Sequence, residues 1–165
     1  MWSVKKSKVH GSGVFATEYI PKGKKIIQYI GDKITKSEGD RRSELRIKKY
    51  LNSKKTGSVY IFELNKKYDI DGSPLYNKAR YINHSCDPNC EVDIIDNQIW
   101  ISSTKKIKSG EELTYDYGYT FDREDYRDHP CRCASKNCIG FIISSDDWHK
   151  FLKHLKKNIN KLKKL

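Results

Sequence analysis

The cysteines of this 165-residue chain are the residues whose types and spacing most directly suggest chemistry. Three of the five form a Cys-x-Cys-x4-Cys run at Cys131, Cys133 and Cys138. Thiolates this close together are typical of a loop that holds zinc in tetrahedral geometry, and such a site needs a fourth ligand. Unligated buried thiols are the alternative. The candidates for the fourth ligand are Cys86, Cys90, His84 and His129.

Two further segments carry recognisable patterns. Residues 79–90 read Ala-Arg-Tyr-Ile-Asn-His-Ser-Cys-Asp-Pro-Asn-Cys, and residues 110–117 read Gly-Glu-Glu-Leu-Thr-Tyr-Asp-Tyr. Upstream lie His-Gly-Ser-Gly at 10–13 and Tyr-Ile-Phe at 60–62. With the cysteine run, these motifs resemble the SET-domain protein-lysine methyltransferases in their order and spacing. The resemblance covers roughly residues 5–143.

The resemblance implies a mainly β fold, in which small curved sheets surround a knot-like crossing and helices are few and short. It divides the chain into a SET domain at 1–122 and a post-SET zinc-binding loop at 123–143, followed by a basic C-terminal helix at 144–165. It also implies that Cys86 completes the zinc site with Cys131, Cys133 and Cys138.

The activity that the resemblance implies is methyl transfer from S-adenosylmethionine to a lysine amine. A free lysine has a pKa of about 10.4 and is charged near neutrality, whereas the reacting amine must be neutral. A narrow aromatic channel lowers that pKa by desolvation. The channel positions are Tyr60, Tyr115 and Tyr117, with Tyr117 as the residue that orients the amine. A tyrosine at 115 favours mono- or dimethylation.

By the same resemblance, the cofactor binds the turn near residue 10 and the motif near residue 83. Phe141 is the hydrophobic residue expected to cover the adenine, with Trp148 behind it. The full set of predicted cofactor-binding residues is His10, Ser12, Gly13, Tyr29, Arg80, Tyr81, Asn83, His84 and Phe141.

The elements that must position these residues are mostly short strands. Gly11-Ser12-Gly13, Pro21-Lys22-Gly23 and Ser109-Gly110 predict turns. Strands are expected at 26–30 and 113–117. Hairpins are expected at 59–70, with Asn65 near the turn, and at 91–102 around Asp96-Asn97.

Two helices are predicted. The first follows the capping-box pattern of Thr35 to Glu38 and runs to about Leu51, with Leu45, Ile47 and Leu51 toward the core. The second starts near Asp146, with Ser145 or Asp146 as its cap and an apolar stripe at Trp148, Leu152, Leu155, Ile159 and Leu162. We expect the second helix to pack back on the domain; pairing with a partner or lying on a membrane are the alternatives.

Charge is uneven along the chain. The net charge is +12, and residues 150–165 contain seven lysines and no acid. A basic surface favours acidic partners, so the tail could contact nucleic acid, unless it is only a solvated face. The apolar stripe of the last helix leaves monomer and dimer both open. No secretory h-region or membrane-length apolar run is present, which predicts an intracellular protein, cytoplasmic in a prokaryote and nuclear in a eukaryote.

The expected partner is a protein with an accessible lysine, either a histone or another basic protein. The sequence leaves two other functions open besides catalysis. The chain could be a zinc-stabilised nucleic-acid-binding module, or an inactive SET fold that serves as a scaffold. The retained Tyr117, Asn83 and His84 favour the enzyme.

Overall fold

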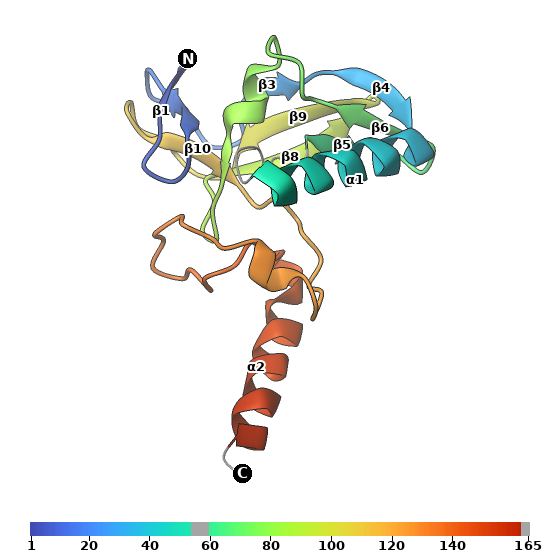
Figure 1. Ribbon diagram of the computed structural model, residues 1–165. Helices are drawn as coiled ribbons and strands as arrows, with labels where there is room; N and C mark the ends of the chain where they lie inside the picture. Colours follow the sequence, from blue (N-terminus) through green and yellow to red (C-terminus); the bar gives the residue numbers. More distant parts are fainter. Residues whose placement is uncertain (54–59, 163–165) are drawn as a thin grey trace.

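Short strands in three small sheets dominate the computed structural model, which describes residues 1–53 and 60–162 (Figure 1). The first sheet has the order β1-β2-β10-β7 and consists of β1 (Trp2–Lys6), β2 (Ser12–Ala16), β10 (Glu112–Tyr115) and β7 (Asn83–His84). The predicted turn between the first two strands is confirmed, with Gly11 at a φ of 48°. β7 runs parallel to β10, which brings the two long motifs of the sequence side by side.

The other two sheets consist of antiparallel pairs in the orders β3-β9-β8 and β4-β6-β5. The hairpin predicted around Asp96-Asn97 is confirmed, and both residues have the positive φ that a two-residue hairpin turn requires. The hairpin predicted at 59–70 is confirmed over β5 and β6, although Val59 lies outside the described residues. The strands are β3 (Lys25–Tyr29), β9 (Gln98–Ser103), β8 (Cys90–Ile95), β4 (Asp32–Thr35), β6 (Tyr68–Asp71) and β5 (Ile61–Glu63).

The main hydrophobic core is built from inward-facing side chains of these strands. Val14, Ile101 and Leu113 are completely buried in it. Burying one aliphatic side chain of this size stabilises a fold by roughly 1.5–3 kcal/mol. Tyr29 and Tyr115 belong to the same cluster, so two of the predicted site residues are part of the core itself.

The first helix, α1 (Lys36–Ser53), begins as the sequence predicts. The Thr35 hydroxyl accepts a hydrogen bond from the Glu38 amide at 3.3 Å, which is the capping bond of the predicted box. The prediction that Leu45 and Ile47 face the core is wrong, because their side chains are 53% and 46% exposed. The side chain of Leu51 lies outside the described residues.

A polar contact explains which face of α1 turns inward. Arg42 and Arg46 both donate to the carboxylate of Asp71 on β6, at 2.7 and 2.8 Å. Asp71 is fully buried, and its arginine partners hold the pKa of its carboxyl below the usual value against the opposing effect of burial. The helix is therefore anchored to the sheet by ion pairs, and Leu45 and Ile47 are left on the outer side.

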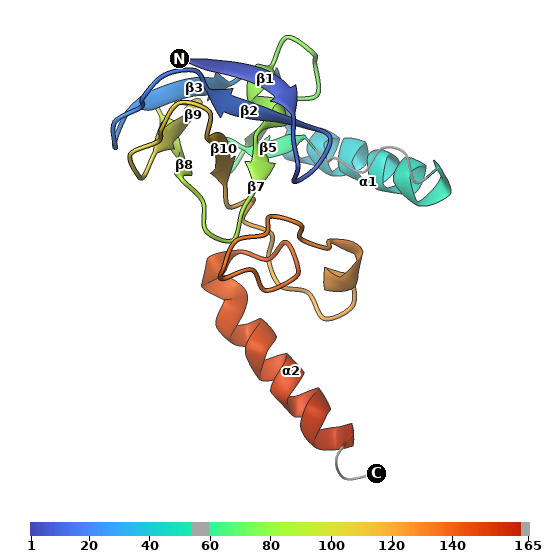
Figure 2. The same ribbon diagram turned by 90° about the vertical axis from the view of Figure 1, so that its left-hand side faces the viewer.

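The second helix, α2 (Trp148–Leu162), starts on the domain and then extends away from it (Figures 1 and 2). Packing back is thus confirmed for its first turns, where Trp148, Phe151 and Leu155 join a second hydrophobic cluster around Tyr126 and Ile143. The side chains of Ile159 and Leu162 lie outside the described ones.

A short 3-10 turn, Ser145–Asp147, precedes α2. Ser144 caps this turn by accepting a hydrogen bond from the Asp146 amide at 3.4 Å. Ser145 and Asp146, the predicted helix caps, lie within the turn, and α2 begins at Trp148.

Together these elements confirm a mainly β fold with small sheets and two helices in the part of the chain that the structure describes. Within the same residues, neither helix combines the length and apolarity needed to cross a bilayer.

Candidate active site and metal centre

Four cysteine sulfurs meet at one point below the β7–β10 pair. The Sγ atoms of Cys86, Cys131, Cys133 and Cys138 all lie within 4.8 Å of one another. Cys86 lies 3.8 Å from Cys131 and 3.9 Å from Cys138, sulfur to sulfur. Zinc–sulfur bonds of about 2.3 Å in a tetrahedron place neighbouring sulfurs about 3.8 Å apart, so the spacing fits a zinc ion.

Backbone amides around the cluster point at its sulfurs. The amides of Cys86 and Gly140 donate to Cys133 and Cys138, each at 3.4 Å. Burial alone would raise the pKa of Cys133, but the hydrogen bonds from the Cys86 amide and from Ser135 outweigh it and lower that pKa. A thiolate is the form that binds metal. Of the other candidate ligands, Cys90 lies outside the four-sulfur group and bonds to Asn89.

The predicted cofactor turn is tied to the Asn-His motif by Asn83. The Asn83 side-chain amide donates to the Ser12 carbonyl at 3.0 Å, to the His10 carbonyl at 3.4 Å, and to the Glu112 carboxylate at 2.7 Å. A Cβ at Gly13 would collide with the same carboxylate, so a larger residue there would displace the Glu112 side chain from Asn83. Asn83 on β7 therefore ties the turn at residues 10–13 to Glu112 on β10.

The His84 side chain connects the cysteine cluster to the tyrosine motif. Its Nδ1 accepts a hydrogen bond from the Tyr117 amide at 3.2 Å, which places the ring proton on Nε2, 3.6 Å from the sulfur of Cys86. Burial lowers the His84 pKa despite Asp116 nearby, consistent with a neutral ring. The predicted strand 113–117 ends at Tyr115. The Tyr117 amide donates to the His84 ring instead of to a neighbouring strand.

A continuous row of aromatic rings runs through the predicted channel positions. Tyr115 and Tyr117 have ring centroids 5.1 Å apart, and Phe62 lies 6.0 Å from Tyr115. Tyr29 and Tyr119 extend the row at its two ends. The Tyr117 hydroxyl donates to the Ile82 carbonyl at 3.0 Å. Burial raises the pKa of Tyr29, Tyr115, Tyr117 and Tyr119, so these hydroxyls stay uncharged at neutral pH.

Tyr60 sits beside this row and stacks on a cation. Its ring lies 4.1 Å from the Arg80 guanidinium, and Tyr81 lies 5.4 Å from it on another side. Arg80 also donates to the Ser73 carbonyl. The Tyr29 hydroxyl donates to the Tyr60 carbonyl at 3.0 Å. Tyr29, Tyr60, Arg80 and Tyr81 therefore form one connected group.

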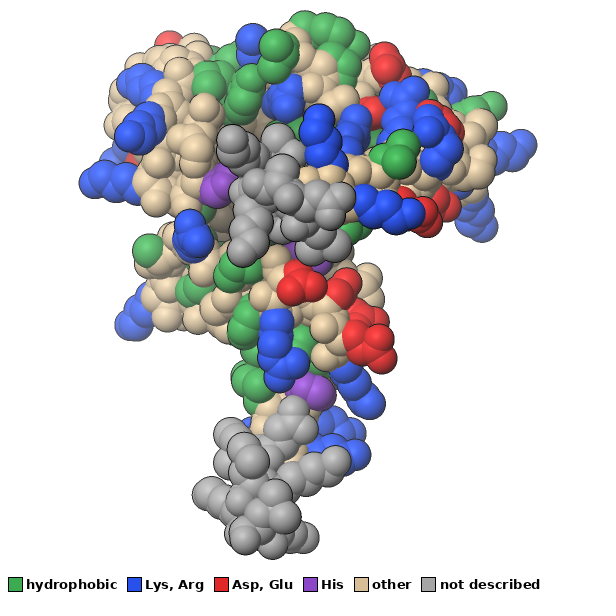
Figure 3. Space-filling model, viewed as in Figure 1, with side chains coloured by type: hydrophobic (Ala, Val, Ile, Leu, Met, Phe, Trp, Pro, Cys, Tyr) green, Lys and Arg blue, Asp and Glu red, His purple; other side chains and the backbone are tan. Residues whose placement is uncertain are grey.

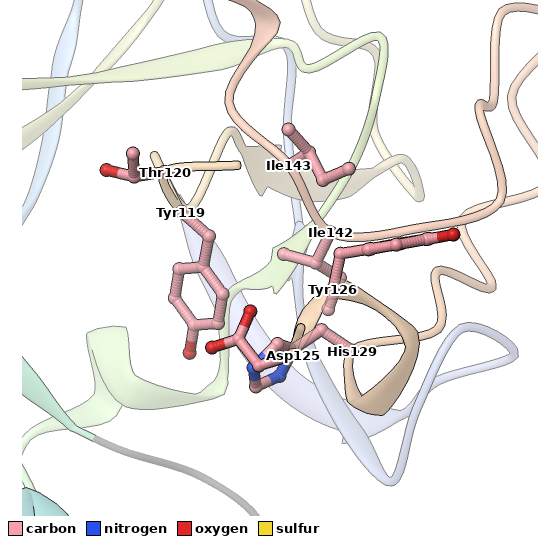
Figure 4. Close-up of a pocket in the computed structure, with 7 residues that line it drawn as sticks. All are labelled: Tyr119, Thr120, Asp125, Tyr126, His129, Ile142 and Ile143. Carbon is pink, nitrogen blue, oxygen red and sulfur yellow. The ribbon is translucent and has the colours of Figure 1, made fainter. Parts of the chain in front are cut away.

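A cavity of about 260 Å³ opens at the Tyr119 end of the row. Figure 4 shows the Tyr119 ring, the Asp125 carboxylate and the His129 imidazole gathered on one side of it, with Ile142 and Ile143 above. Phe141 is not among its lining residues; its ring packs 4.9 Å from Tyr126 and 5.7 Å from Phe151.

Several residues of the site were missed by the sequence reasoning. Phe62 and Tyr119 lie two positions from Tyr60 and Tyr117, and alternation along an extended segment would have placed them on the same side. No comparable sequence pattern pointed to Ile142 or Glu112. The role of Glu112 emerges only when Asn83 and Ser7 both donate to its carboxylate.

Small sheets, four thiols placed where they could hold a metal ion, and a buried tyrosine row together define a β-sheet protein with an aromatic site beside a cysteine cluster. Residues 11–118 match the family model described as the SET domain, and the chain belongs to that family. The chain is 37% identical over 141 residues to "Histone-lysine N-methyltransferase trithorax" of Drosophila virilis, covering 83% of this chain and 3% of that protein.

Two further relatives give the same picture. "Histone-lysine N-methyltransferase, H3 lysine-4 specific" of Saccharomyces cerevisiae is 36% identical over 83% of this chain and 13% of its own length. "Histone-lysine N-methyltransferase trr" of Drosophila melanogaster is 40% identical over 81% of this chain and 5% of its own length. The chain thus spans only a small part of these curated relatives.

The bridge through His84 leads to the first prediction. His84→Leu keeps the ring's approximate bulk but removes both bonds, so the Tyr117 amide should exchange with solvent faster and zinc should bind about 10–100-fold more weakly. Amide hydrogen exchange and competition with a chelator measure the two effects. His149→Leu, an exposed position on α2, is the control. Unchanged exchange at Tyr117 would contradict the bridge.

Proposed function

We propose that this chain is an S-adenosylmethionine-dependent protein-lysine N-methyltransferase. The observation that carries the proposal is the position of Tyr117. Its hydroxyl and amide are each held by a hydrogen bond, and its ring lies between Tyr115 and the His84 imidazole, with centroids 5.1 and 5.4 Å away. The relatives named histone-lysine N-methyltransferases support the same activity.

The tyrosine row would prepare the lysine amine for reaction. Buried rings exclude water, which disfavours the ammonium form and leaves a neutral nucleophile. The Tyr117 hydroxyl donates its proton to Ile82, so its oxygen can accept a hydrogen bond from the amine and fix its direction. Tyr60 and Tyr115 would line the same channel. In the reaction a nitrogen–carbon bond forms, a carbon–sulfur bond breaks, and the amine releases a proton.

The cofactor would lie on the surface that Asn83 organises. S-adenosylmethionine, when bound, supplies a methyl group on a positively charged sulfur. Around it we place His10, Ser12 and Gly13 from the turn and Asn83 and His84 from β7. Tyr29, Arg80 and Tyr81 complete the set. For the adenine we propose the cavity beside Tyr119, with Ile142 at its wall. Phe141, which the resemblance implies as the adenine cover, is the adjacent residue in the chain but packs on Tyr126 instead of lining the cavity.

A zinc ion held by Cys86, Cys131, Cys133 and Cys138 would join the loop 123–143 to the SET domain. The domain division at residues 122 and 143 stays a prediction, supported by the family match that ends at residue 118. The substrate would be a histone or another basic protein, and the protein would be nuclear in a eukaryotic cell.

The test is incubation of the chain with radiolabelled S-adenosylmethionine and a panel of histones and other basic proteins. Label on lysine supports the proposal. Calorimetry with the cofactor and its demethylated product is the second measurement. Absence of both label and cofactor binding would refute the enzyme and favour a scaffold.

Tyr115 leads to a prediction about the product. Tyr115 is almost completely buried and touches Phe62 and Tyr117. Its hydroxyl occupies space that a further methyl group needs, so Tyr115→Phe should shift the product toward trimethyllysine, at least severalfold by mass spectrometry. Tyr68→Phe, on a half-exposed strand position, is the control. A product distribution that is unchanged in Tyr115→Phe would contradict this role.

A further inference from the structure

The last helix leaves the body of the protein after its first turns. These turns pack into the second hydrophobic cluster through Trp148, Phe151 and Leu155, and the His154 ring lies 5.6 Å from the ring of Phe121. Beyond them α2 projects from the body of the protein in both views (Figures 1 and 2). At 1.5 Å per residue, its fifteen residues span about 22 Å. A projecting helix of this length presents a surface to another molecule.

That surface is basic. Lys153, Lys156 and Lys157 are exposed on it, and the sequence of α2 contains no acidic residue. Figure 3 shows Lys and Arg side chains on both sides of the part of the helix drawn in colour. Lys150 pairs with Asp147 at 2.6 Å, so at least this one charge is neutralised within the chain.

The spacing of the lysines destabilises the helix by repulsion between like charges. Lys156 lies three residues after Lys153, and Lys157 lies four residues after Lys153. Like charges at these spacings destabilise an isolated helix by about 0.2–0.5 kcal/mol per pair. Two copies of α2 side by side would add further repulsion, which disfavours a dimer through this helix. A polyanion removes the repulsion.

The kind of polyanion follows from what the exposed face lacks. Protein interfaces are depleted in lysine and enriched in aromatic anchors. The aromatic side chains of α2, Trp148 and Phe151, pack into the second hydrophobic cluster instead. In the described part of α2, only Leu152 is an exposed large apolar side chain, so the exposed face does not resemble a protein interface. Without exposed aromatic rings, the helix also has no platform on which unpaired bases stack. We propose that α2 binds the phosphate backbone of duplex DNA without regard to sequence.

The test is fluorescence anisotropy of the 165-residue chain with a labelled duplex of about 20 base pairs, titrated at several salt concentrations. The variant is K153Q/K156Q/K157Q. Its matched control is K22Q/K66Q/K67Q, which removes the same charge from exposed positions outside α2. Circular dichroism checks that α2 is retained.

Three lost phosphate contacts should reduce the slope of log affinity against log salt by about 2.7 and weaken binding at least about tenfold, while the control stays near wild type. Equal loss in variant and control overturns the proposal. Tighter binding to polyglutamate than to the duplex also overturns it, in favour of an acidic protein. Methylation of a free peptide should be the same in variant and wild type, so this result is separate from the proposed enzyme activity.

Discussion

Removal of the metal from the cysteine centre is expected to abolish lysine methylation. The reason is structural, since the closed four-sulfur site has no open position for a substrate. Cys131, Cys133 and Cys138 belong to an irregular loop, and Cys86 lies two residues after the end of β7. Structural zinc contributes apparent free energies on the order of 10 kcal/mol in small sites, far more than the few other bonds of this loop. Without it, the loop should leave the tyrosine row and the cavity.

Cys86→Ser is the variant that tests this without a chelator. We expect zinc content to fall from about one ion per chain toward zero and kcat to become undetectable, with faster proteolysis within residues 129–140. Cys90→Ala is the control, because Cys90 is also buried but lies outside the four-sulfur group. Full turnover after complete removal of zinc would contradict the structural role.

Tyr117→Phe is expected to lower kcat by about 10²-fold while the affinity for S-adenosylmethionine changes little. The variant keeps the ring and its contacts with Tyr115 and His84. It also keeps the hydrogen bond from its backbone amide to His84 Nδ1. It loses only the hydroxyl that is anchored to Ile82 and that would orient the amine. Since the ring remains, the channel still excludes water, and the loss falls on alignment of the nucleophile.

Single-turnover methylation measures the chemical step, and calorimetry measures cofactor binding in the same variant. Tyr19→Phe, which removes a hydroxyl from an exposed ring outside the row, is the control. A kcat within twofold of wild type would show that the Tyr117 hydroxyl takes no part in alignment. A large loss of cofactor affinity would place Tyr117 in binding instead.

The sequence by itself determined the local structure where local chemistry is strong. Asp96-Asn97 specifies a hairpin turn because these residues tolerate positive φ, and Thr35 specifies a helix start because its hydroxyl caps a free amide. The three clustered cysteines predicted a metal loop from spacing alone. The ordered motifs also predicted membership of the SET-domain family, which the family match confirms.

The tertiary structure decided which side chains meet. Spacing could not choose the fourth metal ligand among Cys86, Cys90, His84 and His129. The folded structure brings the sulfur of Cys86 to 3.8 Å from that of Cys131. The resemblance had pointed to the same residue. A buried carboxylate must be paired, and Asp71 pairs with Arg42 and Arg46. These ion pairs turn the arginine face of α1 inward, so Leu45 lies on the outer face. Helical periodicity depends only on the sequence of the helix itself. It therefore cannot reveal a partner on another element, such as Asp71 on β6.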